Sequence, residues 1–304
     1  MKILFDIGHP AHVHFFKNAI RELEKQGHTV SVTARDRDVT LRLLDAYGIQ
    51  YSVRPSGWRP LNLMLATSFV KKAAREFKAD VLAGVHNPYV AGAAAQLDKP
   101  SVLFTDTPGS PFVNRISVGR ASAVVTPECL AGLFPNQITY PGYKEMAYLH
   151  PRYFKADESA PARAGVGSEY FLARFISWDA HHDSGISPTD EDVRAALVSK
   201  LGRTLVSLEG RDDGILPQDL HSLLYHSAGC VSEGATLAKE AAVLGVPSAY
   251  VSPLAESLPP IMEMARTGRL RAFPDFSSVE LPPRSGPMEM CDVTSVIIKS
   301  LENP

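Results

Sequence analysis

The chain has little cysteine and no apolar run long enough to cross a membrane. Its three cysteines, Cys129, Cys230 and Cys291, are widely separated and form no CxxC pair. This spacing suggests neither a disulfide framework nor a structural zinc site. A spanning helix needs about 18 consecutive apolar residues, and no run approaches that length. The start, Met1-Lys2-Ile3-Leu4-Phe5-Asp6, carries an acid at its sixth position and favours a first strand over a signal peptide. We therefore expect a cytoplasmic protein.

The chain also lacks an excess of charge of either sign. It has 31 Lys and Arg against 33 Asp and Glu in 304 residues, a net charge of −2. A duplex nucleic-acid binder needs a basic face, so no nucleic-acid partner is expected. The patterns GxGxxG, GxxxxGK[ST] and GxSxG are missing from the sequence. Their absence argues against a dehydrogenase, a P-loop nucleotidase and an α/β-hydrolase.

Apolar runs that alternate with helical patterns are what the chain does contain. Strands are expected near 3–7 and 81–85 and a small-residue helix over 88–97, and this alternation predicts parallel sheets covered by helices on both faces. The alternation breaks between 140 and 167 and then restarts. The pattern predicts two doubly wound Rossmann-type domains with a cleft between them, and ligands at the carboxyl ends of the strands. The expected boundaries are 1–150, a linker at 151–166, a second domain at 167–285 and a C-terminal helix at 286–304.

The most informative segment runs from Ser232 to Pro247. Gly234 and Ala235 make a turn of small residues after a short apolar strand, and Thr236 begins a helix. Backbone N–H groups and a helix N-terminus at such a turn suit an anion. Glu240 follows one helical turn later, where its carboxylate would accept hydrogen bonds from two sugar hydroxyls. The segment thus predicts a diphosphate cradle with a ribose clamp, and the alternative is an ordinary strand-turn-helix joint with a solvated Glu240.

Three histidines crowd the turn after the first strand. Gly8 permits a tight turn, and His9, His12 and His14 follow it at the start of a helix. Histidine moves protons near pH 7, so this loop is a candidate for facing a substrate. The alternatives are metal ligation, which no nearby carboxylate pattern supports, and histidines that merely cap and pack the helix.

Other polar groups follow strands or lie near the domain junction. His86-Asn87 and Asp106 come at successive strand ends, where one sheet edge would gather them. Near the junction, Lys144 is a candidate for holding a phosphate or carboxylate, and Glu145 for acting as a base. The alternative for these last two is a solvated ion pair.

The second half adds further candidates for binding a nucleotide. Arg174 is placed to neutralise diphosphate charge. The run His181-His182-Asp183 would bind a metal, relay protons or form an ordinary polar loop. His221 lies on a short helix just before the glycine turn and is the better placed of two nearby histidines to reach a nucleotide.

Four ordered segments resemble a prokaryotic family known as domain of unknown function 354, itself similar to GT-B glycosyltransferases and UDP-N-acetylglucosamine 2-epimerases. The resemblance spans nearly the whole chain and implies a GT-B fold with a nucleotide-sugar site. It implies that Gly234, Thr236 and Glu240 meet the donor and that His9 and His12 face the sugar or acceptor. The chain departs from the family in having Ala235 where a second glycine is usual, and its second half looks short. The segments are 6–16, 142–149, 178–183 and 233–242, the last of which includes Glu233.

Three functions follow from the resemblance. The leading one is a glycosyltransferase that uses a nucleotide sugar, with UDP as the expected nucleotide, without a metal or tightly bound cofactor. Arg174, Lys144 and helix dipoles would then stabilise the departing diphosphate, and a base would activate a glycan or lipid-linked acceptor, which allows peripheral membrane contact. The second is a UDP-sugar 2-epimerase, and the third is a non-catalytic nucleotide-sugar-binding protein. Candidate bases for the transferase are His9, His12 and Asp106, and candidate groups for the epimerase are Asp106, Glu128, Glu145 and His221.

Overall fold

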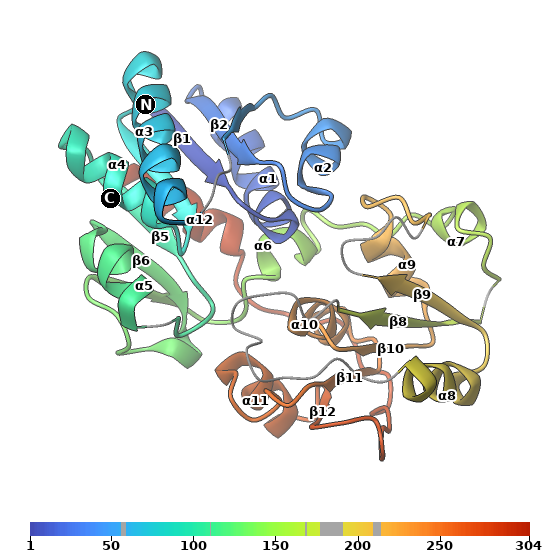
Figure 1. Ribbon diagram of the computed structural model, residues 1–304. Coiled ribbons are helices and arrows are strands. Elements are labelled where there is room, and N and C mark those ends of the chain that lie inside the picture. The colour runs from blue at the N-terminus through green and yellow to red at the C-terminus, as the bar shows by residue number, and fades with distance from the viewer. Residues whose placement is uncertain (56–58, 110, 168, 177–190, 209–213) are drawn as a thin grey trace. The chain divides into compact units, whose positions relative to one another are not determined.

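The computed structural model describes residues 1–55, 59–109, 111–167, 169–176, 191–208 and 214–304 (Figure 1). These residues form two compact units. Unit 1 comprises Met1–His150 together with Met290–Pro304, and unit 2 comprises Pro151–Glu289. Over the described residues, no helix combines the length and the apolarity that crossing a membrane requires.

The sheet of unit 1 has seven strands, in the order β3-β2-β1-β4-β5-β6-β7, and every neighbouring pair is parallel. Its central strands are apolar and buried, as expected for a parallel sheet covered on both faces. The strand order reverses between β1 and β4, which opens a crevice at the carboxyl ends of these two strands. The strands are β1 (Lys2–Ile7), β2 (Thr29–Arg35), β3 (Ser52–Arg54), β4 (Val81–Val85), β5 (Ser101–Phe104), β6 (Ala123–Pro127) and β7 (Gln137–Tyr140).

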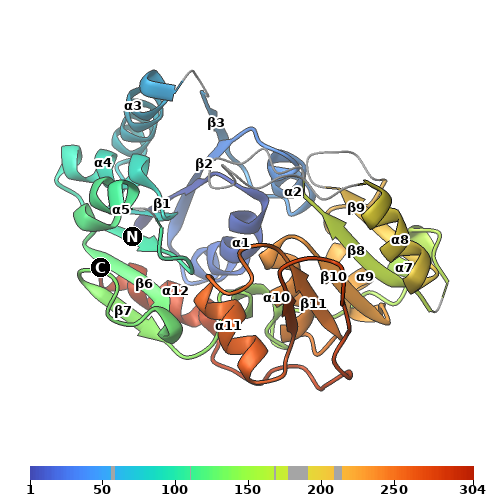
Figure 2. The same cartoon turned by 60° about the horizontal axis from the view of Figure 1, so that its bottom comes forward.

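Helices cover both faces of this sheet (Figure 2). Helices α3 and α4 pack together on one face over a core that includes Leu4, Val70, Leu82 and Val90. Helix α1 lies on the other face with α2, α6 and the C-terminal helix α12. The helical segments are α1 (Pro10–Lys25), α2 (Thr40–Ala46), α3 (Arg59–Phe77), α4 (Pro88–Leu97), α5 (Pro111–Ile116), η1 (Val118–Arg120), η2 (Glu128–Leu130), α6 (Met146–Leu149) and α12 (Val293–Glu302).

Unit 2 is built around a five-stranded parallel sheet in the order β12-β11-β10-β8-β9. Its order reverses between β8 and β10, so the glycine turn that follows β10 lies at this second reversal. The strands are β8 (Phe171–Phe175), β9 (Thr204–Leu208), β10 (Gly229–Ser232), β11 (Ser248–Val251) and β12 (Arg271–Phe273). The helices are α7 (Ala160–Arg163), α8 (Glu191–Leu201), α9 (Leu220–His226), α10 (Ala235–Val243) and α11 (Pro259–Arg266).

The α/β, doubly wound fold class predicted from the alternation is confirmed, since two parallel sheets are each flanked by helices. The segment expected to be a linker, 151–166, belongs to unit 2 and contains α7. The C-terminal helix returns to unit 1, which makes that unit discontinuous in sequence.

Candidate functional site

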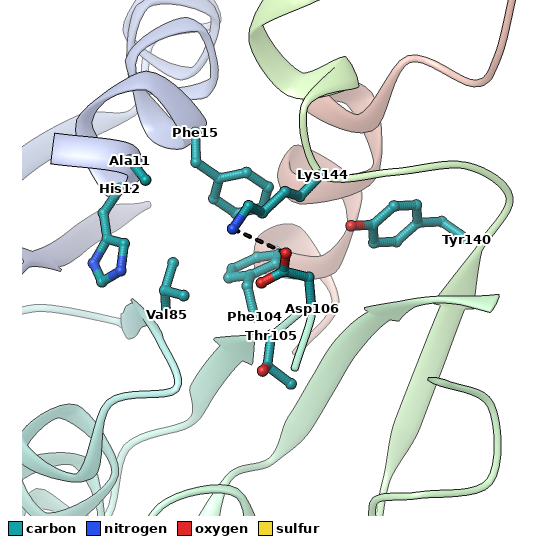
Figure 3. Close-up of a pocket in the computed structure, with 9 residues that line it drawn as sticks. All are labelled: Ala11, His12, Phe15, Val85, Phe104, Thr105, Asp106, Tyr140 and Lys144. Atoms are coloured by element: carbon teal, nitrogen blue, oxygen red, sulfur yellow. Dashed lines mark ion pairs between the residues drawn. The ribbon is translucent and has the colours of Figure 1, made fainter. Parts of the chain in front are cut away.

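A pocket of about 290 Å³, open mouth included, lies at the carboxyl ends of the strands of unit 1 (Figure 3). The first turns of α1 form one wall, and the ends of β4 and β5 form the floor. The end of β7 and the turn before α6 complete the lining. The lining residues are Ala11, His12, Phe15, Val85, Phe104, Thr105, Asp106, Tyr140 and Lys144.

The most polar feature of the pocket is an ion pair. The Nζ atom of Lys144 lies 2.9 Å from Oδ2 of Asp106, and the two side chains are only 18% and 9% exposed (Figure 3). Phe15 and Phe104 line the same pocket, so the pair sits in partly apolar surroundings where its charges are poorly screened. The pair offers an incoming ligand both a hydrogen-bond donor with positive charge and a carboxylate that accepts protons or hydrogen bonds. The alternative expectation of a solvated ion pair at Lys144 and Glu145 is not met, because Glu145 is fully buried and Lys144 is only 18% exposed.

His12 presents a neutral ring to the pocket. Burial lowers its pKa well below the ordinary value, and the nearby His9 and Lys144 lower it further, against the opposing effect of Asp106. The backbone N–H of Gly8 donates to its Nδ1 at 3.3 Å. The proton of the neutral ring therefore sits on Nε2, which makes His12 a hydrogen-bond donor. The predicted role of His12 as a base would require the Nδ1 atom that already accepts from Gly8.

The other predicted residues of the first loop and the junction have structural contacts. His9 is the N-cap of α1, and its Nδ1 accepts from the N–H of Ala11 at 3.2 Å. It therefore serves the capping role that was the alternative to catalysis. Glu145 is fully buried just before α6 and lies outside the pocket lining, and its predicted role as a base stays a prediction.

Asn87, which was predicted as a polar group at a strand end, belongs to a network around Asp6 that sequence reasoning missed. The buried carboxylate of Asp6 accepts from Thr33 at 2.7 Å and from Asn87 at 2.6 Å, and Nε of Arg54 lies 3.1 Å from it. Asn87 also caps α4 through its side-chain oxygen. This network ties together the ends of β1, β2, β3 and β4 beneath the Gly8 turn. The sequence signal that could have revealed the role of Asp6 is a single acidic residue within an otherwise apolar strand.

His86 was predicted among the polar groups at the strand ends, whereas Tyr140 was missed as a site residue. His86 adopts a left-handed backbone, with φ of 44°, at the end of β4. Its ring joins Thr105 at 3.0 Å to Asn114 at 2.8 Å, and burial lowers its pKa. It thereby braces the loop that carries Asp106. Tyr140 lines the pocket from the end of β7, a strand that the sequence pattern did not predict.

In unit 2 the predicted glycine turn forms at the sheet's reversal point. Gly234 is the N-cap of α10, and no side chain caps this helix. Gly234, Ala235 and Thr236 are partly exposed, whereas α10 is buried from Leu237 onward. The turn is therefore the accessible end of an otherwise buried helix, and its N–H groups are suited to an anion.

The charged residues predicted around this turn pair within unit 2. Glu233 accepts from Arg194 at 2.6 Å and from the N–H of Ile176 at 2.9 Å. These contacts tie α8 to the ends of β8 and β10. Arg174 donates to the hydroxyl of Ser207 on the neighbouring strand. The implied contacts of Glu233 and Arg174 with a ligand stay predictions.

Two other predicted binding residues form a single buried pair. Oε1 of Glu240 lies 3.1 Å from Nε2 of His221, and each side chain is 4% exposed. His181 lies outside the described residues, as does the rest of the His-His-Asp run. Among the residues that the structure describes, no three His, Cys, Asp or Glu side chains gather in a way that could hold a metal.

Residues 1–157 match the family described as a protein of unknown function, DUF354. The chain belongs to this family. A further relative, uncharacterized protein MJ0665 from Methanocaldococcus jannaschii, is 21% identical over 338 aligned positions that cover 100% of this chain and 98% of that protein.

Solved structures share the fold of this family member at low sequence identity. The UDP-GlcNAc 2-epimerase of M. jannaschii, solved with UDP-GlcNAc and UDP, matches with a TM-score of 0.72 and 13% identity over 100% of both chains. The glycosyltransferase SsfS6 from Streptomyces sp. SF2575 matches with a TM-score of 0.55 and 14% identity, covering 90% of this chain and 87% of that one. These likenesses establish the GT-B-like fold.

Proposed function

We propose that the protein is a glycosyltransferase that uses a nucleotide sugar, with UDP as the nucleotide. The observation that carries this proposal is the Lys144–Asp106 pair inside the pocket of unit 1. The pair lies at the carboxyl ends of a doubly wound sheet, where ligands of such sheets bind. The structures of similar fold include a glycosyltransferase and an enzyme solved with UDP-GlcNAc and UDP, which supports the choice of substrate class.

The number of carboxylates favours transfer over epimerisation. Transfer needs one base to take the proton of the acceptor hydroxyl, whereas a 2-epimerase must remove and return a proton at carbon 2 and eliminate the nucleotide between these steps. Among the described residues that line the pocket, Asp106 is the single carboxylate. In this proposal Asp106 accepts the proton from the acceptor hydroxyl, while Lys144 and the Nε2–H of His12 donate to oxygens that gain negative charge. The acceptor is proposed to be a glycan or lipid-linked sugar.

The turn at Gly234 is proposed to bind the diphosphate. Gly234 has an ordinary φ of −91°, and a methyl group there would lie 3.6 Å from Ile176 and from Ser232. An alanine therefore fits the protein but stands where a phosphate would approach the N-terminus of α10. Gly286 offers a matched control in unit 2, since nothing lies within 4 Å of an added methyl group there.

A second candidate is a UDP-sugar 2-epimerase. The observation in its favour is the TM-score of 0.72 to the M. jannaschii 2-epimerase along the whole chain. The same binding groups would serve it. The two candidates differ in their products, because an epimerase needs no acceptor.

The test is NMR of the purified protein with UDP-GlcNAc, combined with titrations of UDP. We expect UDP to bind, and UDP to be released slowly from UDP-GlcNAc by transfer to water. The G234A variant should bind UDP at least about tenfold more weakly while G286A binds normally, and D106N should abolish release without weakening UDP binding. Appearance of a 2-epimer would replace the transferase with the epimerase. Binding without turnover by any donor or acceptor would indicate a non-catalytic protein, and no binding of UDP would overturn the proposal.

A further inference from the structure

Tyr140 is a buried tyrosine with an unusual hydroxyl. The residue is 3% exposed and lines the pocket of unit 1 from the end of β7. Its hydroxyl points toward the side of the pocket that holds Lys144 and Asp106 (Figure 3). Among the described residues, none forms a hydrogen bond with this hydroxyl. The buried Tyr170 of unit 2 behaves in the usual way, since its hydroxyl donates to the carbonyl of Leu223 at 2.6 Å.

The hydroxyl of Tyr140 keeps its proton. Burial raises the pKa of Tyr140 well above 10, and the negative charges of Asp106 and Glu145 raise it further. The phenol is therefore neutral over the whole physiological range. It can donate one hydrogen bond to a ligand atom in the pocket. None of the described residues accepts a hydrogen bond from it.

The rest of the pocket indicates which acceptor fits. Phe15, Phe104 and Val85 form apolar walls, while Nε2 of His12 and Nζ of Lys144 add further donors. A ligand that suits this lining has apolar C–H faces and oxygen atoms around its edge. A pyranose ring has this character, and ligand sites commonly combine apolar walls with a few placed polar groups in this way.

We propose that Tyr140 is a specificity-determining residue that donates a hydrogen bond to an oxygen of the sugar ring held in this pocket. The inference rests on the proposed function and names the part of the nucleotide sugar that the pocket recognises. Tyr140 would differ from the residues that contact the nucleotide, because loss of the Tyr140 hydroxyl should weaken binding of the sugar-bearing ligand alone.

The test compares Y140F with Y51F. Phenylalanine keeps the ring and removes only the hydroxyl, so the shape of the core is preserved. Tyr51 lies in the same unit, and its hydroxyl donates to Asp45 at the surface, away from the pocket. Each purified variant would be titrated calorimetrically with UDP and with UDP-GlcNAc, and its thermal unfolding would be measured without ligand. We expect Y140F to bind UDP-GlcNAc about 5- to 20-fold more weakly, to bind UDP as the wild type does, and to unfold at an equal or higher temperature.

The outcomes separate the inference from the proposed function. A lower unfolding temperature for Y140F without a selective loss of UDP-GlcNAc affinity would make Tyr140 a structural residue and overturn the inference. Equal weakening of UDP and UDP-GlcNAc, or no weakening of either, would overturn it as well. If the wild-type protein binds neither compound, the proposed function itself fails and the inference fails with it. Y51F should match the wild type in both titrations.

Discussion

At the scale of single residues, the pocket of unit 1 brings several ionisable side chains close together in a small volume. His12, Asp106 and Lys144 line it, and each alters the electrostatic environment of the others. The consequence is clearest at His12, whose ring is held neutral by burial and by the positive charge of Lys144. A histidine of this kind makes the stability of the fold depend on pH.

His12 should destabilise the fold in acid. The pKa of His12 is near 6.5 in the unfolded chain and well below that in the folded protein. Below pH 6.5 the unfolded state therefore binds a proton at His12 that the folded state does not bind. Stability is therefore complete above about pH 6.5 and is lost as the pH falls toward the folded pKa, by at most about 1.4 kcal/mol per pH unit for one proton. H12Q should remove this contribution and flatten the fall in stability.

The measurement is urea unfolding from pH 7.5 to pH 5. His86, whose pKa is also lowered, remains in H12Q and keeps part of the slope. H150Q is the control, because His150 lies outside the pocket lining. A slope in H12Q as steep as in the wild type would contradict the prediction.

At the scale of elements, the loop after β5 depends on a close fit between Gly109 and His86. Gly109 has φ of 67°, and a methyl group there would lie 2.3 Å from Cε1 of His86. Gly132, in the same unit, has φ of 80° with nothing within 4 Å of an added methyl group. An alanine at either position would be strained by the left-handed backbone. Only at position 109 would its methyl group also clash with His86.

G109A should therefore destabilise unit 1 more than G132A. The left-handed backbone alone costs about 1–2 kcal/mol, and overpacking against His86 adds about 1–3 kcal/mol at Gly109. The displaced loop carries Asp106, so G109A should also reduce the release of UDP from UDP-GlcNAc, whereas G132A should not. Urea unfolding and the NMR assay measure the two effects. Equal destabilisation by the two variants would show that His86 moves aside without cost.

The elements also show how far the sequence leads. Helix α4 and strand β4 have the expected bounds, because buried apolar runs and flanking caps are local signals. Strand β7 was missed because it is a short edge strand whose Ile138 and Thr139 are exposed, so it lacks a buried apolar run. Strand β12 and helix α11 were missed as well.

The candidate site was predicted less completely than the fold. Asp106 and Lys144 were each expected to be polar groups near a ligand, and their pairing across about forty residues of chain was not, since no local pattern encodes it. The same holds for Glu233, whose carboxylate pairs with Arg194 on α8. Tyr140 stayed hidden because its strand was missed. Positions that depend on long-range contacts required the three-dimensional structure.

At the scale of the whole molecule, the chain returns to its first unit at its end. Helix α12 packs against α1 and α6. The hydroxyl of Thr294 and the amide of Asn18 both donate to the carbonyl of Ala147, at 2.7 and 2.9 Å. This shared acceptor joins α1, α6 and α12 close to Lys144. Helix α12 therefore supports the turn before α6, which carries Lys144 into the pocket.

Truncating the core face of α12 should therefore loosen unit 1. Ile297 and Leu301 are fully buried, and replacing either with alanine should cost about 2–5 kcal/mol. Hydrogen exchange followed by mass spectrometry would measure the effect by segment. We expect faster exchange in α1 and α6 in both I297A and L301A and unchanged exchange in α10, because α12 belongs to unit 1. K299A, on the exposed side of α12, is the control. Equal acceleration in α10 would mean that the two units unfold as one, and the affinity for UDP would then fall together with the stability of unit 1.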